Sequence, residues 1–231
     1  MYKNTHCTAI IVAAGQGTRA GGTIPKQFVE ICGKPILFHT VSKFQENAYI
    51  DEIIIATRKD YVGYCKDYAE KNGYGKLSCV VAGGAERQET VSRALEVIKG
   101  GIVVIHDGVR TFVEDRHISE CVYRAYETGA CALGVPVKDT LKRVNGAEIT
   151  QTVDRDNLWA IQTPQAFSYD VLTKAYAQAD ADGFVGTDDA SLVERFGALV
   201  SVVEGSSRNF KITTPEDVAL AKICFRFHKQ Q

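Results

Sequence analysis

Short apolar runs rich in β-branched residues alternate with amphipathic stretches along most of the chain. The apolar runs predict strands that are mostly buried on both faces, and they lie at 7–13, 50–57, 77–83, 101–107 and 131–137. The stretches between them carry apolar residues at helical spacing, and they lie at 35–47, 87–99 and 114–129, where Gly129 is a candidate C-terminal cap. This repeated order of strand and helix favours an α/β fold with a mainly parallel central sheet flanked by helices.

The pattern changes at about 138–158, where apolar and polar residues alternate. Asn145-Gly146 lies in the middle of this segment and is a strong signal for a hairpin turn. A hairpin inserted in an α/β domain can extend the sheet or act as an arm that reaches a second subunit. The length of the segment alone favours the sheet extension.

Helical patterns resume after the hairpin, at 168–179, 187–197 and 214–225. In the last of these, Thr214, Pro215 and Asp217 have the spacing of a capping box with proline in the first turn. No repeat, low-complexity segment or flexible linker interrupts the pattern. Residues 1–231 are therefore expected to form a single domain with the hairpin as an insertion.

Composition narrows the possible partners and the compartment. The chain has 231 residues and a formal net charge of -1, so a general nucleic-acid or polybasic membrane surface is not expected, and any attraction for anions must be local. Its seven cysteines are scattered without a Cys-x-x-Cys pair, and reduced thiols of this kind fit the cytoplasm. Its apolar runs are too short for a signal peptide or a membrane span.

The glycine-rich stretch "AAGQGTRAGGTIPKQF" follows the first predicted strand. It contains the Gly-x-Gly-x-x-Ala spacing of a dinucleotide loop, but Pro25 and two further glycines keep the chain from entering a helix, and no acidic residue follows at the ribose position. A Walker loop is also excluded because Gly33-Lys34 is followed by proline. The remaining interpretations are a phosphate-binding loop with the cations Arg19 and Lys26, or an ordinary surface loop with two solvated cations.

Two other strand ends favour the phosphate-binding interpretation. Gly83-Gly84 ends one strand before a helix that carries Thr90, and a flat base or ribose could lie against this backbone. The fourth predicted strand ends in His106-Asp107, with Arg110 three residues later. A carboxylate at that end of a parallel strand lies where open α/β sheets bind ligands, and one carboxylate with phosphate oxygens and waters is a usual way to hold Mg²⁺. An N-cap role for Asp107 is the alternative.

Six segments together resemble the 2-C-methyl-D-erythritol 4-phosphate cytidylyltransferase family, whose members are Rossmann-like enzymes of non-mevalonate isoprenoid biosynthesis. These segments are "AAGQGTR…PKQF", "GGAERQETV", "IHDGVRTF", "RDNLWAIQTPQAF", "GTDDASLVE" and "NFKITTPEDVALA". They occur in the family's order from the first strand to the last helix. The resemblance implies that CMP is transferred from CTP to methylerythritol phosphate, with release of pyrophosphate.

The resemblance also implies roles for particular residues. The CTP-binding residues would be Ala13, Ala14, Gly15, Gly17, Gly83 and Thr90. The catalytic cations would be Arg19, Lys26 and Lys211, and Asp107 would coordinate Mg²⁺. The methylerythritol phosphate would be surrounded by Arg110, Thr140, Arg155 and Thr187, with Lys211. In the family the hairpin is an arm that crosses to the partner of a homodimer, which would replace the sheet extension favoured above.

This sequence departs from the family pattern at two positions that bear on the site. Ala85 stands where some members have an aspartate near the base, so a backbone contact must serve there. Thr111 replaces the more usual proline after Arg110, which would loosen that turn. Two alternatives remain, a ribitol-5-phosphate cytidylyltransferase with the same CTP half and a non-catalytic nucleotide-binding module. The retention of Arg19, Lys26 and Asp107 together argues against a mere binder.

Overall fold

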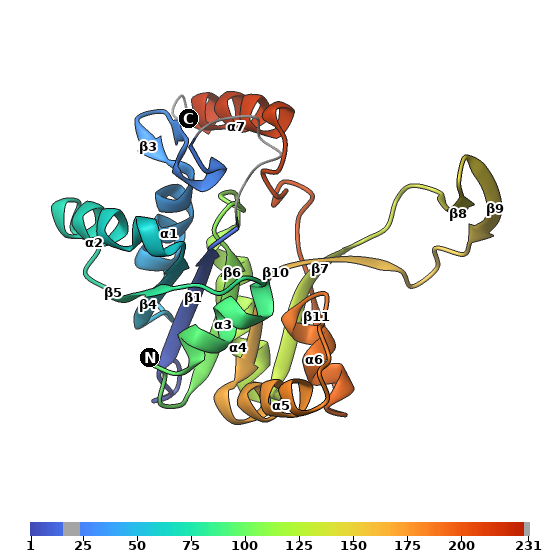
Figure 1. The fold of residues 1–231 in the computed structure, drawn as a ribbon, viewed down its shortest axis with the longest axis horizontal. Helices are drawn as coiled ribbons and strands as arrows, with labels where there is room; N and C mark the ends of the chain where they lie inside the picture. The colour runs from blue at the N-terminus through green and yellow to red at the C-terminus, as the bar shows by residue number, and fades with distance from the viewer. Residues whose placement is uncertain (16–23, 229–231) are drawn as a thin grey trace.

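A seven-stranded twisted sheet forms the centre of the molecule in the computed structural model, which describes residues 1–15 and 24–228 (Figure 1). The order of its strands is β11-β7-β10-β6-β1-β4-β5. Their bounds are β1 Cys7–Ala13, β4 Glu52–Thr57, β5 Leu77–Ala82, β6 Ile102–Asp107, β7 Ala130–Pro136, β10 Trp159–Ser168 and β11 Ser201–Glu204. Two further pairs, β2 Glu30–Ile31 with β3 Lys34–Pro35 and β8 Leu141–Asn145 with β9 Glu148–Val153, lie outside this sheet.

The sheet is mainly parallel, as the sequence predicts. β1 lies between β6 and β4 and is parallel to both, β4 is parallel to β5, and β11 is parallel to β7. The exception is β10, which pairs antiparallel with β6 and with β7. Because the parallel strands end at one edge, the residues that follow β1, β5 and β6 are brought together there.

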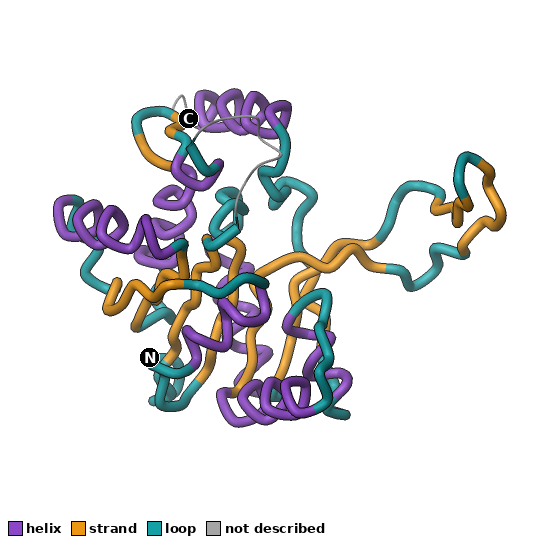
Figure 2. Tube along the Cα trace, in the orientation of Figure 1, coloured by secondary structure: helices purple, strands orange, loops and turns teal. Residues whose placement is uncertain are grey.

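Helices cover both faces of the sheet because successive strand residues point to opposite sides. Ala9 and Ile11 of β1 pack in one apolar cluster with the helices α1 Ile36–Glu46, α2 Val62–Lys71 and α4 Asp115–Thr128. Ile10 packs on the other side with the helices α3 Arg87–Leu95, α5 Tyr169–Ala181 and α6 Asp189–Arg195. The last helix, α7 Pro215–His228, lies beyond one end of the sheet, beside β3 (Figures 1 and 2).

Two predicted helix ends are confirmed. Gly129 has φ 87° and ends α4, with its N–H donating to the Ala125 carbonyl. The Thr214 hydroxyl accepts from the Asp217 N–H, and the Asp217 carboxylate accepts from the Thr214 N–H, which is the expected capping box. Among the described residues, no helix combines the length and the apolar character that crossing a bilayer requires.

Other details differ from the prediction. The strand at 77–82 is at the sheet edge, so most of its side chains are only half buried rather than covered on both faces. Sequence patterning missed α2 and the short strand β11. It also missed β10, because a register shift between Ile161 and Gln165 breaks the alternation of apolar and polar residues along this strand.

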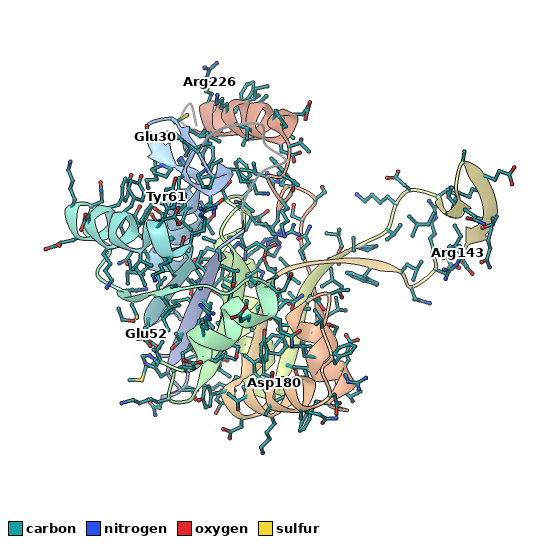
Figure 3. The ribbon with its side chains drawn as sticks, viewed as in Figure 1. Glu30, Glu52, Tyr61, Arg143, Asp180 and Arg226 are labelled. Carbon is teal, nitrogen blue, oxygen red and sulfur yellow. The ribbon has the colours of Figure 1, made fainter. Side chains whose placement is uncertain are left out.

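The segment 138–158 is not an extension of the central sheet. Its strands β8 and β9 pair only with each other among the described strands, and nearly all of their residues are exposed. Figure 2 shows this arm extending away from the body on two long connections from β7 and β10, and Figure 3 shows Arg143 near its far end. The preference for a sheet extension is therefore wrong. The alternating pattern and the Asn145-Gly146 turn predict a hairpin, but they do not specify whether its strands pair with the central sheet.

We expect Gly101→Ala to destabilise the fold by about 3 kcal/mol. Gly101 has φ +88°, and an added Cβ would lie 2.1 Å from the His6 carbonyl oxygen, so both backbone and neighbour oppose a side chain. Gly63→Ala is the control, because that position in α2 has open space and a helical backbone, and the change should stabilise by about 0.5 kcal/mol. Urea unfolding of both variants measures the difference, and equal stability of the two would contradict this account.

Candidate functional site

A cavity of about 580 Å³ opens at the edge where β1, β5 and β6 end. It brings together predicted residues from five separate segments, namely Ala13, Ala14, Gly15, Lys26, Gly83, Thr90, Asp107 and Lys211. The predicted residues Gly17 and Arg19 lie outside the described residues. The cavity is therefore built from backbone-rich turns, and the predicted cations Lys26 and Lys211 share it with the predicted carboxylate Asp107.

Gln27 fixes the two ends of the glycine-rich segment to each other. Its buried side-chain amide donates to the Ala13 carbonyl at 2.8 Å and to the Gly15 carbonyl at 2.9 Å. Pro25, with φ -56°, immediately precedes the short 3₁₀ turn Lys26–Phe28, which places Lys26 at the cavity. Sequence analysis missed Gln27, because a glutamine after a basic residue carries no signal of a contact to a distant strand end.

The glycine turn after β5 is shaped by close packing. A Cβ on Gly83 would lie 2.5 Å from the Ala14 Cβ and 2.9 Å from Thr90, so only glycine lets this turn approach β1. The Thr90 hydroxyl donates to the Glu86 carbonyl and accepts from the Gly84 N–H. The Ala85 N–H donates to the Glu89 carboxylate at 2.7 Å. Thr90 thus lines the cavity while its hydroxyl holds the turn in place.

Asp107 is the centre of the charge arrangement. Its Oδ2 lies 3.0 Å from Lys211 Nζ and 3.3 Å from Arg110 Nε, and its Oδ1 lies 3.7 Å from Arg87 Nε. The three cations come from different parts of the chain: α3, the turn after β6, and the segment before α7. Burial by itself would raise the pKa of Asp107, but these positive charges hold the pKa well below its usual range.

Arg87 links this carboxylate to a second buried one. Its Nη2 lies 2.6 Å from Oδ2 of Asp189, a fully buried residue whose Oδ1 accepts from the Tyr176 hydroxyl, also at 2.6 Å. Burial lowers the pKa of Arg87, but the charges of Asp189 and Asp107 outweigh this and raise it above its ordinary value. Sequence analysis assigned no role to Arg87, because its partners come from elements far away along the chain.

His106 and Thr163 hold the backbone of Asp107. The Thr163 hydroxyl accepts from the Asp107 N–H and contacts His106 Nδ1, each at 3.0 Å, and His106 Nε2 lies 3.0 Å from the Arg110 carbonyl. Thr163 lies where the register of β10 shifts, which turns its side chain toward β6. Burial lowers the pKa of His106 to about 4. His106 is therefore neutral at pH 7, with both ring nitrogens in contact with structural partners.

The predicted substrate-binding residues are divided between the body and the arm. Arg110 contacts Asp107 and donates from Nη1 to the Asn209 carbonyl at 2.8 Å, so the turn positions it although Thr111 follows. Thr187 is exposed just before α6, outside the cavity lining. Thr140 and Arg155 are exposed at the base of the arm, where Arg155 donates to the Lys138 carbonyl. One chain does not bring these two residues to its own cavity.

The donor set at Asp107 fits a metal ion that arrives with phosphate. Within the described ranges, no group of three or more His, Cys, Asp or Glu could hold a metal ion by itself. Mg²⁺ commonly binds one carboxylate and completes its oxygen ligands with phosphates and water. Oδ1 of Asp107 is the candidate ligand atom, because its distance from Arg87 exceeds that of a hydrogen bond whereas Oδ2 lies close to two cations.

Comparisons with known proteins agree with the resemblance read from the motifs. The family model described as 2-C-methyl-D-erythritol 4-phosphate cytidylyltransferase matches residues 7–226. Proteins of that name from Halalkalibacterium halodurans and Geotalea uraniireducens are 43% and 44% identical over 93% of this chain, covering 95% and 94% of their own lengths. The 4-diphosphocytidyl-2C-methyl-D-erythritol synthase structure from Anaerococcus prevotii matches with a TM-score of 0.85 and 31% identity over 97% of both chains.

A further solved structure extends the likeness. The 2-C-methyl-D-erythritol 4-phosphate cytidylyltransferase structure from Thermus thermophilus has a TM-score of 0.78 and 32% identity, and the match covers 94% of this chain and 98% of that one. The likeness therefore extends over essentially the whole of this chain and of its relatives.

The buried His106 gives a testable dependence of stability on pH. Because its pKa in the folded protein is below the unfolded value, the unfolded chain binds this proton first, and stability is lost as the pH falls from 6.5 toward 4. The His106→Gln variant should lack this component, which is about 3 kcal/mol over that range. Urea unfolding at several pH values measures it, and parallel curves for both proteins would contradict a buried neutral His106.

Proposed function

The chain belongs to the 2-C-methyl-D-erythritol 4-phosphate cytidylyltransferase family, and we propose that the cavity around Asp107 is the active site for the family's reaction. The protein is a nucleotidyltransferase that transfers CMP from CTP to 2-C-methyl-D-erythritol 4-phosphate, giving 4-diphosphocytidyl-2-C-methyl-D-erythritol and pyrophosphate for isoprenoid biosynthesis. The names of the relatives favour methylerythritol phosphate over ribitol phosphate, and they describe an enzyme rather than a non-catalytic nucleotide-binding module.

The observation that carries the placement is the group of cations around one carboxylate at a glycine-lined sheet edge. Lys211, Arg110 and Arg87 contact Asp107, and Lys26 lines the same cavity. Two polyanions must meet in this reaction, and such a site offsets their repulsion. When phosphates enter, Lys211 and Arg110 can exchange part of their contact with Asp107 for contacts with phosphate oxygens.

We assign the nucleotide to the glycine-rich side of the cavity. The proposed CTP-binding residues are Ala13, Ala14, Gly15, Gly17, Gly83 and Thr90. The backbone N–H groups of the first strand end can approach a triphosphate closely, because small or absent side chains leave room. Asp107 would hold Mg²⁺, which would supply charge neutralisation at the phosphates.

The chemistry requires alignment and charge stabilisation rather than a general base. A phosphate oxygen of methylerythritol phosphate attacks the α-phosphorus of CTP, the new O–P bond forms, and the bond to the pyrophosphate oxygen breaks with its electron pair. The nucleophile is already an anion at pH 7, so no proton must be removed. Arg19, Lys26 and Lys211 would stabilise the negative charge that moves toward pyrophosphate.

We further propose that the active protein is a homodimer in which each arm completes the partner's site. Thr140 and Arg155 are candidates for the alditol phosphate together with Arg110 and Thr187, yet they lie on an arm that extends away from the body (Figure 1). The arm also exposes Val144 and Ile149, at 57% and 66%, and apolar residues in this position favour contact with a second subunit.

The remaining proposals concern the compartment and other partners. The seven cysteines form no disulfide, and four of them are buried, which fits a reducing cytoplasm. The net charge of -1 supports small-molecule substrates rather than nucleic acid or a membrane surface.

We expect the wild-type protein to release pyrophosphate from CTP with methylerythritol phosphate and not with ribitol phosphate. The Asp107→Asn variant should lower this turnover at least about 100-fold. The amide keeps the shape of the side chain but removes the anionic ligand and the charge that gathers Lys211 and Arg110. The measurement is turnover against Mg²⁺ concentration, with thermal unfolding to verify the fold.

Asp60→Asn is the matched control for this variant. Asp60 also lines the cavity and pairs with Arg58 at 2.9 Å, but its side chain is exposed, so its loss should leave turnover within a few-fold of wild type. Full activity of Asp107→Asn at limiting Mg²⁺ would reduce Asp107 to a structural strand-end residue.

The arm proposal predicts complementation between two inactive variants. If Arg155 acts in the partner's site, Lys26→Ala and Arg155→Ala homodimers are each nearly inactive, but a mixed dimer has one site with both lesions and one with neither. Random exchange gives about half mixed dimers, so about one site in four is restored. Activity after subunit exchange, verified by native mass spectrometry, measures this.

Arg143→Ala controls for general damage to the arm, because Arg143 lies near the far end of the hairpin (Figure 3). This variant should stay active alone. A mixture of the two inactive variants that exchanges subunits but shows no activity would place Arg155 in its own chain's site.

A further inference from the structure

A second cavity lies between α7 and the segments 111–114 and 208–210, apart from the proposed active site. Its volume is about 360 Å³, and its walls are largely aromatic, with Phe112, Phe210 and Phe225. The Phe112 ring lies 5.2 Å from the Phe210 ring and 4.8 Å from the Phe225 ring, so the three side chains form one apolar surface. An apolar surface of this size around an open volume accommodates a small ligand.

Thr111 is an unusual member of this lining. It is fully buried, and its hydroxyl is one of four buried polar side-chain atoms without a hydrogen-bond partner in the described structure. An unpaired hydroxyl in such a place costs free energy. It has no exposed surface, so Thr111 supports the wall of the cavity and its hydroxyl does not face the open volume.

The mouth of the cavity carries positive charge. Arg208 lines it with a side chain that is 73% exposed, and Lys43 of α1 lines it as well. Glu114 is the acidic residue among the lining side chains, and it is shared between Arg116 at 2.8 Å and Arg208 at 3.3 Å. The balance favours an anionic group at the mouth.

The two walls of the cavity are the same segments that position the active site. Along 208–211, Arg208 and Phe210 line the second cavity, whereas Lys211 contacts Asp107. Along 110–114, Arg110 contacts Asp107, and the next residues line the second cavity. The two segments are joined by hydrogen bonds, from Arg110 to the Asn209 carbonyl and from the Ile212 N–H to the Val109 carbonyl. A ligand in the second cavity therefore contacts the same two segments that carry Arg110 and Lys211.

We propose that this second cavity is a regulatory binding site for a small amphiphile with an apolar chain and one anionic head group. The chain occupies the phenylalanine-lined space, and the head group meets Lys43 and Arg208. Occupancy shifts the 110–114 and 208–211 segments and changes turnover without competing with CTP. The change in turnover rests on the proposed active site around Asp107, whereas binding of the amphiphile does not.

Isothermal titration calorimetry with decanoate and with geranyl phosphate tests the proposal, because a fatty acid and an isoprenoid phosphate share this chemistry. At least one should bind the wild-type protein, bind equally well in saturating CTP and Mg²⁺, and change the turnover number. Decanol should bind more weakly than decanoate. Displacement by CTP, or no binding of either probe at millimolar concentration, overturns the proposal.

Three variants locate the bound probe. Cys224→Phe fills the cavity from α7 and should weaken binding about tenfold or more. Ile223→Phe changes an exposed neighbour outside the lining and should not weaken binding.

Arg208→Gln should weaken the binding of decanoate but not that of decanol, and Lys222→Gln is the charge control on α7. Thr111→Val should leave binding nearly unchanged, because the hydroxyl that it removes has no exposed surface. Wild-type affinity in Cys224→Phe or in Arg208→Gln overturns the assignment, and basal turnover of these variants shows that the active site is intact.

Discussion

The ion pairs of Asp107 organise the functional edge of this protein. A carboxylate in a buried position is unfavourable unless positive charge compensates it, and here the compensation comes from Arg87, Arg110 and Lys211. Each cation would in turn repel the others without the carboxylate between them. The carboxylate at the end of β6 therefore holds α3, the turn after β6 and the segment before α7 in one arrangement. Cations held in this way can exchange a carboxylate partner for a phosphate group.

The same interaction connects the site to the core behind it. Arg87 is held between Asp107 and the fully buried Asp189, which also accepts from the Tyr176 hydroxyl. Because Asp189 begins α6, the position of that helix is tied to the position of a cation at the cavity. Removing one partner of a buried ion pair lowers the stability of the fold much more than the intact pair raises it, because the other charge is left buried without compensation. The helices α5 and α6 thus contribute to the site without lining it.

The sequence predicts those parts of the molecule that depend on local pattern or on strand ends. The parallel strands, the Gly129 cap and the capping box at Thr214 follow from neighbours in the chain, and the glycine turns and Asp107 meet because parallel strands end at one edge. Contacts such as Arg87 with Asp189, or Gln27 with two strand-end carbonyls, depend on which distant elements pack together. The direction of the arm is equally non-local, since a hairpin signal such as Asn145-Gly146 does not specify what the hairpin faces.

The contacts of Gln27 have a consequence for how this enzyme can vary. One side-chain amide joins the carbonyls of Ala13 and Gly15 to the turn that presents Lys26, so Gly15 and Lys26 are fixed relative to each other. The entropic cost of joining two fixed points of a chain grows only slowly with the number of residues between them. Insertions and deletions between Gly15 and Pro25 are therefore expected to cost little stability, while Lys26 keeps its place at the cavity.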